Sequence, residues 1–155
     1  MLEMIKTPCI GVCSTGIGDA VCRGCKRFSH EVVNWNGYSF EQKKLIDDRL
    51  SHFLQQIVET KLRVVDPKKL KWHLNMQQID HPEHKSPSLW AYELLRAGAS
   101  QIADLSDYGV ELHRESLDTP LIDLRRIIDQ EFYILSEAHY QRYFAHPISY
   151  SEQLG

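Results

Sequence analysis

Four cysteines are the residues whose type and spacing could support unusual chemistry. They form two close pairs, Cys9-x3-Cys13 and Cys22-x2-Cys25, and the 130 residues after them contain no other cysteine. Two pairs joined by a short loop can fold back so that four sulfur atoms surround one metal centre, or they can form two disulfides. The four cysteines are therefore the candidate metal ligands.

The redox environment of the protein distinguishes a metal centre from a pair of disulfides. The N-terminal sequence lacks the basic region and the apolar stretch of about 7–15 residues that mark a signal peptide. No run reaches the roughly 18 apolar residues needed to span a membrane. We therefore expect a cytoplasmic protein. Because cytosolic thiols are kept reduced, paired cysteines there more often bind metal than form disulfides. A redox-active dithiol and inert thiols remain as alternatives.

The cysteines leave the identity of the metal open. Thiolate-rich tetrahedral sites suit both Zn(II) and iron–sulfur clusters. Both pairs fit the spacing of zinc knuckles, whereas neither familiar ferredoxin spacing is present. Zn(II) is slightly favoured, and a 4Fe–4S cluster is the alternative. Arg23, Lys26 and Arg27 lie beside the second pair, and their charges would offset the negative charge of either centre.

The residues around the cysteines resemble a small bacterial family. The similar stretches are Pro8-Cys-Ile-Gly-Val-Cys13, Cys22-Arg-Gly-Cys-Lys-Arg27 and Glu31-Val-x-x-Trp35. Together they resemble the YdhL-like family (domain of unknown function 1289), which is labelled a predicted iron–sulfur protein, over roughly residues 7–58. The resemblance implies an iron–sulfur centre as one option and assigns no reaction. Phe28 stands where the family has a helix-capping Thr, so we expect Ser29 to take over as N-cap.

The remaining sequence predicts helices from their start signals. Ser39-x-x-Gln42 is a capping box that begins an amphipathic helix over residues 40–62. Asp66-Pro67 predicts a helix over residues 67–77, after a connector or short strand at 62–66. Further helices are predicted from Ser86-Pro87 to Gly98 and from Thr119-Pro120 onward.

These elements predict a mostly α fold. We expect a small N-terminal four-cysteine metal knob packed on a compact helical domain. The corresponding segments are residues 1–37, which are cysteine-rich and metal-binding, and residues 38–150, which are helical. At 155 residues the chain is long enough for the two to form one compact unit with a substantial core.

Charge is distributed unevenly along the chain. Residues 1–80 hold 12 Lys and Arg against 9 Asp and Glu, whereas residues 81–155 hold 6 against 12. Lys68, Lys69 and Lys71 lie beside Trp72 and His73, and basic patches with aromatic residues can hold nucleic acid. The commoner alternative is a solvated helix with one buried tryptophan. The candidate partner-binding residues are Arg23, Lys26, Arg27, Lys68, Lys69 and Lys71.

Two functional classes fit these features. The first is a four-cysteine structural or interaction module for a macromolecular partner, either protein or RNA. The second is an iron–sulfur protein that transfers electrons or senses redox state. Four cysteines on one metal leave no open position for substrate, which argues against hydrolytic metal chemistry, and the chain has no nucleotide-binding loop; whether it is an enzyme stays open. His81-x2-His84 could ligate a metal, although a solvated pair in a polar loop is more common.

Overall fold

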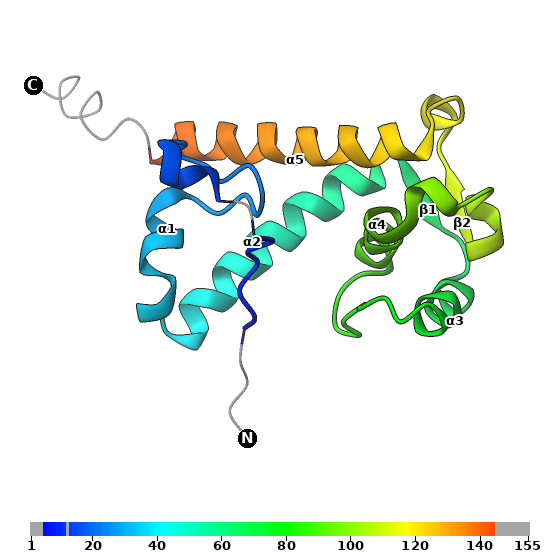
Figure 1. Cartoon of the computed structure of the whole chain (residues 1–155), viewed down its shortest axis with the longest axis horizontal. Helices are drawn as coiled ribbons and strands as arrows, with labels where there is room; N and C mark the ends of the chain where they lie inside the picture. The colour runs from blue at the N-terminus through cyan, green and yellow to red at the C-terminus, as the bar shows by residue number, and fades with distance from the viewer. Residues whose placement is uncertain (1–4, 12, 145–155) are drawn as a thin grey trace, which may run out of the picture. The chain divides into compact units, whose positions relative to one another are not determined.

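The structure, a computed structural model, describes residues 5–11 and 13–144 (Figure 1). Five α-helices and two short strands make up its regular elements within these residues, and 3-10 turns connect several of them. The helices are α1 (Ser29–Asn34), α2 (Phe40–Glu59), α3 (Pro67–Met76), α4 (Pro87–Gly98) and α5 (Leu121–Tyr143). The strands are β1 (Leu62–Val64) and β2 (Val110–Leu112). The predicted mostly α class is confirmed.

Contacts divide the chain into two units. The first unit comprises Met1–Leu50 with Phe132–Gly155, and the second comprises Ser51–Glu131. Helices α2 and α5 each contribute residues to both units. The predicted boundary after residue 37 stays a prediction, and its C-terminal limit at 150 lies outside the described residues. In the described part of the chain, no helix has the length and apolar character needed to cross a membrane.

Local capping starts the helices where the sequence predicts them. At α2, the Gln42 amide donates to Ser39 Oγ at 3.2 Å, and the Ser39 amide donates to Gln42 Oε1 at 2.8 Å. At α3, the Asp66 carboxylate accepts from the Lys69 amide at 3.1 Å. Each contact satisfies an amide that the first helical turn leaves without a partner. Helix α2 ends at Glu59 rather than 62, where the Thr60 hydroxyl donates to the Ile57 carbonyl.

The N-terminus of α1 differs from the prediction. Ser29 is the first helical residue rather than the cap, and Phe28 occupies the N-cap position. The Phe28 ring cannot accept a hydrogen bond, but its backbone amide donates to Glu31 Oε1 at 2.8 Å. The Glu31 half of the capping box is therefore enough to begin this short helix, and the predicted Ser29 cap is wrong.

The second unit is built around an apolar core. Strand β2 pairs antiparallel with β1, with Leu62 opposite Leu112 and Val64 opposite Val110. The sequence analysis did not predict β2. The fully buried side chains of the core come from α2, both strands and helices α3–α5, and they are Val58, Leu62, Leu70, Leu74, Ala91, Leu94, Leu95, Val110, Leu124 and Ile128.

The first unit is centred on Phe28, whose side chain is fully buried. The Arg49 guanidinium lies 4.1 Å from the centre of the Phe28 ring and makes two hydrogen bonds to the Glu31 carboxylate, at 2.6 and 2.7 Å. From α5, His139 and Tyr140 place their rings 6.0 and 5.2 Å from that of Phe28. Residues of α1, α2 and α5 therefore contact the Phe28 ring or the partly buried Glu31–Arg49 ion pair beside it.

Replacing Glu31 by Gln should strongly destabilise the first unit. The substitution leaves the Arg49 charge unpaired, and because Arg49 is 16% exposed the loss should be below the cost of about 3–5 kcal/mol for a fully buried pair. Asp48→Asn is the matched control, because it breaks an exposed ion pair between Asp48 and Lys44, both in α2. It should lower the free energy of unfolding by less than about 0.5 kcal/mol. Denaturant unfolding measures both, and equal losses for the two variants would contradict this account of the first unit.

His139 should make stability depend on pH. Burial lowers its pKa, the Arg49 charge lowers it further, and Glu31 acts in the opposite direction. The folded protein therefore binds fewer protons at this site than the unfolded chain. The free energy of unfolding should be highest above the unfolded-state pKa of about 6.5 and should fall as the pH drops through that value. Denaturant titrations between about pH 5 and 8 measure the slope. His139→Gln should remove this contribution, and an unchanged slope in that variant would contradict it.

Candidate metal centre

The second cysteine pair lies in a tight backbone loop. Val21 and Phe28 form an antiparallel bridge, so the chain turns back on itself between them. The Cys22 amide donates to the Arg27 carbonyl at 2.9 Å, and the Lys26 amide donates to the Cys22 carbonyl at 2.8 Å. Lys26 adopts a left-handed conformation (φ 67°), which closes the turn directly after Cys25. The loop buries Cys22 and Cys25 to 1% and 7% exposure.

Hydrogen-bond donors converge on the Cys22 sulfur. Burial raises the pKa of the Cys22 thiol, but the backbone amides of Cys25, Ser14 and Gly24 donate to its sulfur, as does the Cys25 side chain, and the net result is a pKa of about 7. Burial raises the pKa of Cys25, against the effect of Arg27, whose Nε donates to Cys25 Sγ at 3.3 Å. Cys22 is therefore stabilised as a thiolate, the form that binds metals.

The first cysteine pair is exposed. The Gly11 amide donates to Cys9 Sγ at 3.4 Å, and Cys13 Sγ lies 2.9 Å from Thr15 Oγ1. Ser14 links this segment to the second pair, because its amide donates to the Cys22 sulfur and its hydroxyl accepts from the Arg23 amide at 2.8 Å. The backbone next to Cys13 therefore contacts the loop that holds Cys22 and Cys25.

The structure does not gather all four cysteines. It brings Cys22 and Cys25 together, and it forms no disulfide among the four, all of which lie in the described residues. Within residues 5–11 and 13–144, no group of three or more His, Cys, Asp or Glu side chains is arranged to hold a metal ion. The donors around Cys22 nevertheless fit the chemistry of a thiolate ligand. The site of Cys9, Cys13, Cys22 and Cys25 stays a prediction.

The basic residues beside the loop have two different environments. Lys26 is 1% exposed, with its Nζ 3.0 Å from the Gly24 carbonyl and 5.4 Å from the centre of the Phe132 ring. Arg27 is 4% exposed and lies against the Trp35 ring. Arg23 is exposed and paired with Asp19 at 3.2 Å. Lys26 and Arg27 are therefore placed to offset thiolate charge, and neither presents a surface to a partner.

The second basic cluster lies on α3 and is accessible. Lys68 and Lys69 are exposed, and Trp72 is 58% exposed. The alternative of a solvated helix with one buried tryptophan is therefore wrong for Trp72. Lys71 differs from its neighbours, because its Nζ forms an ion pair with Glu83 in the loop after α3. The cluster thus has one exposed side around Trp72 and one side that faces this loop.

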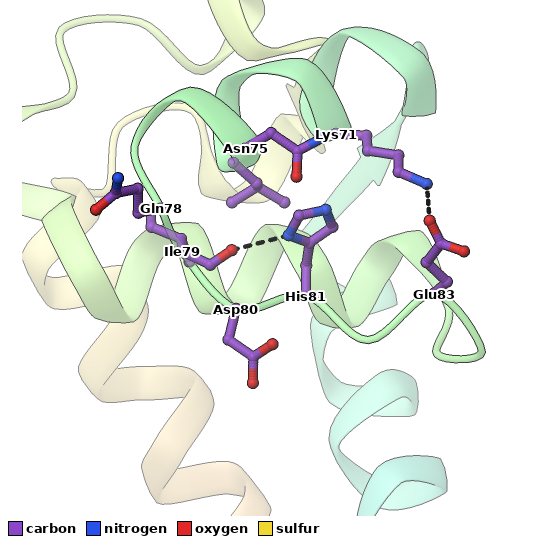
Figure 2. A pocket seen from close by; sticks show the side chains of 8 residues that line it. Lys71, Asn75, Gln78, Ile79, Asp80, His81 and Glu83 are labelled. Carbon is purple, nitrogen blue, oxygen red and sulfur yellow. Dashed lines mark hydrogen bonds and ion pairs between the residues drawn. The ribbon is translucent and has the colours of Figure 1, made fainter.

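A shallow pocket of about 490 Å³ lies on the Lys71 side of α3 (Figure 2). Figure 2 shows His81 near the middle of the lining, its Nδ1 2.8 Å from the Ile79 carbonyl, with the Lys71–Glu83 pair to one side. The sequence singled out Lys71 and His81 but gave no signal for the other lining residues, Leu74, Asn75, Gln78, Ile79, Asp80 and Glu83. His84 does not line the pocket with His81. The amide, carboxylate and ammonium groups present could hydrogen-bond a small polar ligand.

Comparison with known proteins supports the family resemblance. Residues 7–53 match the model of a family described as "Protein of unknown function (DUF1289)", which confirms the resemblance to that family over this segment. The match includes both cysteine pairs, Glu31 and Arg49. Its description names no metal and no activity. Comparisons with curated proteins and with solved structures gave no match.

Proposed function

We propose that this protein is a four-cysteine metal-binding module that supports a helical domain in binding a macromolecular partner. The observation that carries the metal part is the environment of Cys22, where three backbone amides and the Cys25 side chain donate to one buried sulfur. A buried apolar thiol needs no such donors. A thiolate ligand is stabilised by all of them.

The charges nearby support the same proposal. Arg27 is buried with its Nε 3.3 Å from Cys25 Sγ, and a buried cation is stabilised by negative charge beside it. Four thiolates on Zn(II) would carry a local charge of about −2, which the Arg27 guanidinium would partly offset. With four protein ligands the metal has no open coordination position, so its role would be structural rather than catalytic.

An iron–sulfur protein that transfers electrons or senses redox state is the second candidate. The exposure of Cys9 and Cys13 favours it, because a cluster bound through them would lie close to solvent and to an electron-transfer partner. Buried cations would also stabilise the reduced form of a cluster, since its potential responds to local charge. The donor environment of Cys22 fits either metal, and the knuckle spacing slightly favours zinc.

Metal analysis distinguishes the two candidates. We expect protein purified without oxygen to be colourless and to contain about one zinc per chain, as a closed tetrahedral site requires. Elemental analysis and an absorption spectrum of the same sample measure this. Brown protein with broad visible absorption and stoichiometric iron would overturn zinc and favour the iron–sulfur candidate. Protein with neither metal would contradict both.

Cys22→Ser should release the N-terminal segment while leaving the second unit folded. Residues 7–27 contain few apolar side chains, so their order should depend on metal–ligand energy. Hydrogen exchange should become fast there and stay slow in α3 and α4. Ile17→Ala is the matched control, because Ile17 is 86% exposed in the same segment, and it should leave both metal content and exchange unchanged. Unchanged protection of residues 7–27 in Cys22→Ser would show that metal does not order this segment.

A further inference from the structure

Helix α3 presents an exposed strip that combines positive charge with an aromatic ring. We define the α3 strip as Lys68, Lys69, Trp72 and Met76, which recur at three- and four-residue spacing and so share one helix face. Trp72 is 58% exposed and Met76 is 65% exposed. The opposite face of α3 buries Leu70 and Leu74 in the core of the second unit. The strip is therefore not needed for packing α3 onto that core.

The two lysines of the strip do not stabilise helix α3. Helix α3 contains three lysines and no Asp or Glu. Lys68 and Lys69 lie in its first turn, where the positive end of the helix dipole makes cations unfavourable. The Lys68 side chain makes no hydrogen bond or ion pair with any described residue, and Lys69 Nζ contacts only the Ser106 carbonyl, at 3.5 Å. Together they leave a local excess of positive charge on a chain whose net charge is −3.

The ring of Trp72 is held in place although it is exposed. It meets the His73 ring edge-on, with centroids 4.8 Å apart and an interplanar angle of 88°. The His73 ring in turn lies 4.6 Å from that of Tyr108, which packs against the core. An exposed ring that is already ordered loses little conformational freedom when a ligand stacks on it. Trp72 is thus a preorganised stacking surface beside two available cations.

We propose that the α3 strip binds single-stranded nucleic acid, with Lys68 and Lys69 contacting phosphates and Trp72 stacking on a base. This inference rests on the proposed partner-binding function and names the partner. Single strands are recognised by this combination of cations that follow the backbone and aromatic rings that stack on bases. Because the whole protein is acidic, the attraction must come from this local cluster rather than from the net charge.

Tryptophan fluorescence gives a direct test. Trp35 and Trp90 are 6% and 8% exposed, so Trp72 is the tryptophan that a ligand can reach. The probe is a single-stranded oligouridylate, titrated into the full chain at low salt. We expect binding to quench the emission of Trp72, and Trp72→Phe should abolish the quenching. Affinity should fall with rising salt with a log–log slope of about −1.4 for two phosphate contacts on a single strand.

Variants distinguish the contribution of Trp72 stacking from that of the two lysines. Trp72→Ala should weaken binding by roughly 5- to 150-fold, the loss of one stacked base, and leave the salt slope unchanged. Lys68→Ala with Lys69→Ala should weaken binding and bring the slope close to zero. Arg114→Ala, an exposed cation of the second unit outside α3, is the matched control for charge and should leave affinity within about twofold. Anisotropy of the labelled oligouridylate measures affinity for variants that lack Trp72.

Two results would overturn the inference. One is absence of binding at low salt by protein that is folded and carries its metal. The other is binding that Trp72→Ala and the double lysine variant leave unchanged. Metal content is measured on the same samples, so failure of nucleic-acid binding is distinguishable from failure of the metal proposal. The first result would leave a protein as the partner of the proposed module.

Discussion

The ion pair between buried Glu31 and partly buried Arg49, beside the Phe28 ring, is the interaction on which the first unit depends. Glu31 accepts two hydrogen bonds from Arg49 and one from the Phe28 amide, so one carboxylate both caps α1 and joins it to α2. Phe28 also closes the cysteine loop through its bridge with Val21. The ion pair therefore helps to position Phe28 at the base of the loop that holds Cys22 and Cys25.

This arrangement explains why so many charged residues are buried in a small unit. Glu31 and Arg49 neutralise each other, while Lys26 and Arg27 are buried next to two thiols, of which Cys22 has its pKa lowered to about 7. Buried cations are stable where negative charge is available. A metal bound by four thiolates would supply that charge. The proposed metal module accounts for the amide donors around Cys22 and for the contact of Arg27 with the Cys25 sulfur.

Features of the structure that depend on neighbouring residues could be predicted from the sequence, and those that depend on distant residues could not. The caps at Ser39 and Asp66 act within four residues, so the starts of α2 and α3 follow directly from the pattern. Strand β2 has three residues and is defined only by pairing with β1, from which it is separated by more than 40 residues. The burial of Lys26 depends on Phe132 of α5, which no local pattern reveals. The cysteine spacing identified the candidate ligands, but only Cys22 and Cys25 are brought together by the fold itself.

The central claim is that four cysteines bind one metal centre, and X-ray absorption spectroscopy of the metal-loaded protein tests it most directly. For zinc, the account predicts four sulfur ligands at about 2.3 Å and no nitrogen or oxygen ligand. Those distances would require Cys9 and Cys13 to join Cys22 and Cys25 around the metal. A first coordination sphere of only two sulfurs, completed by nitrogen or oxygen at about 2.0–2.1 Å, would contradict it. The fold would then hold a two-cysteine site, and Cys9 and Cys13 would need another explanation.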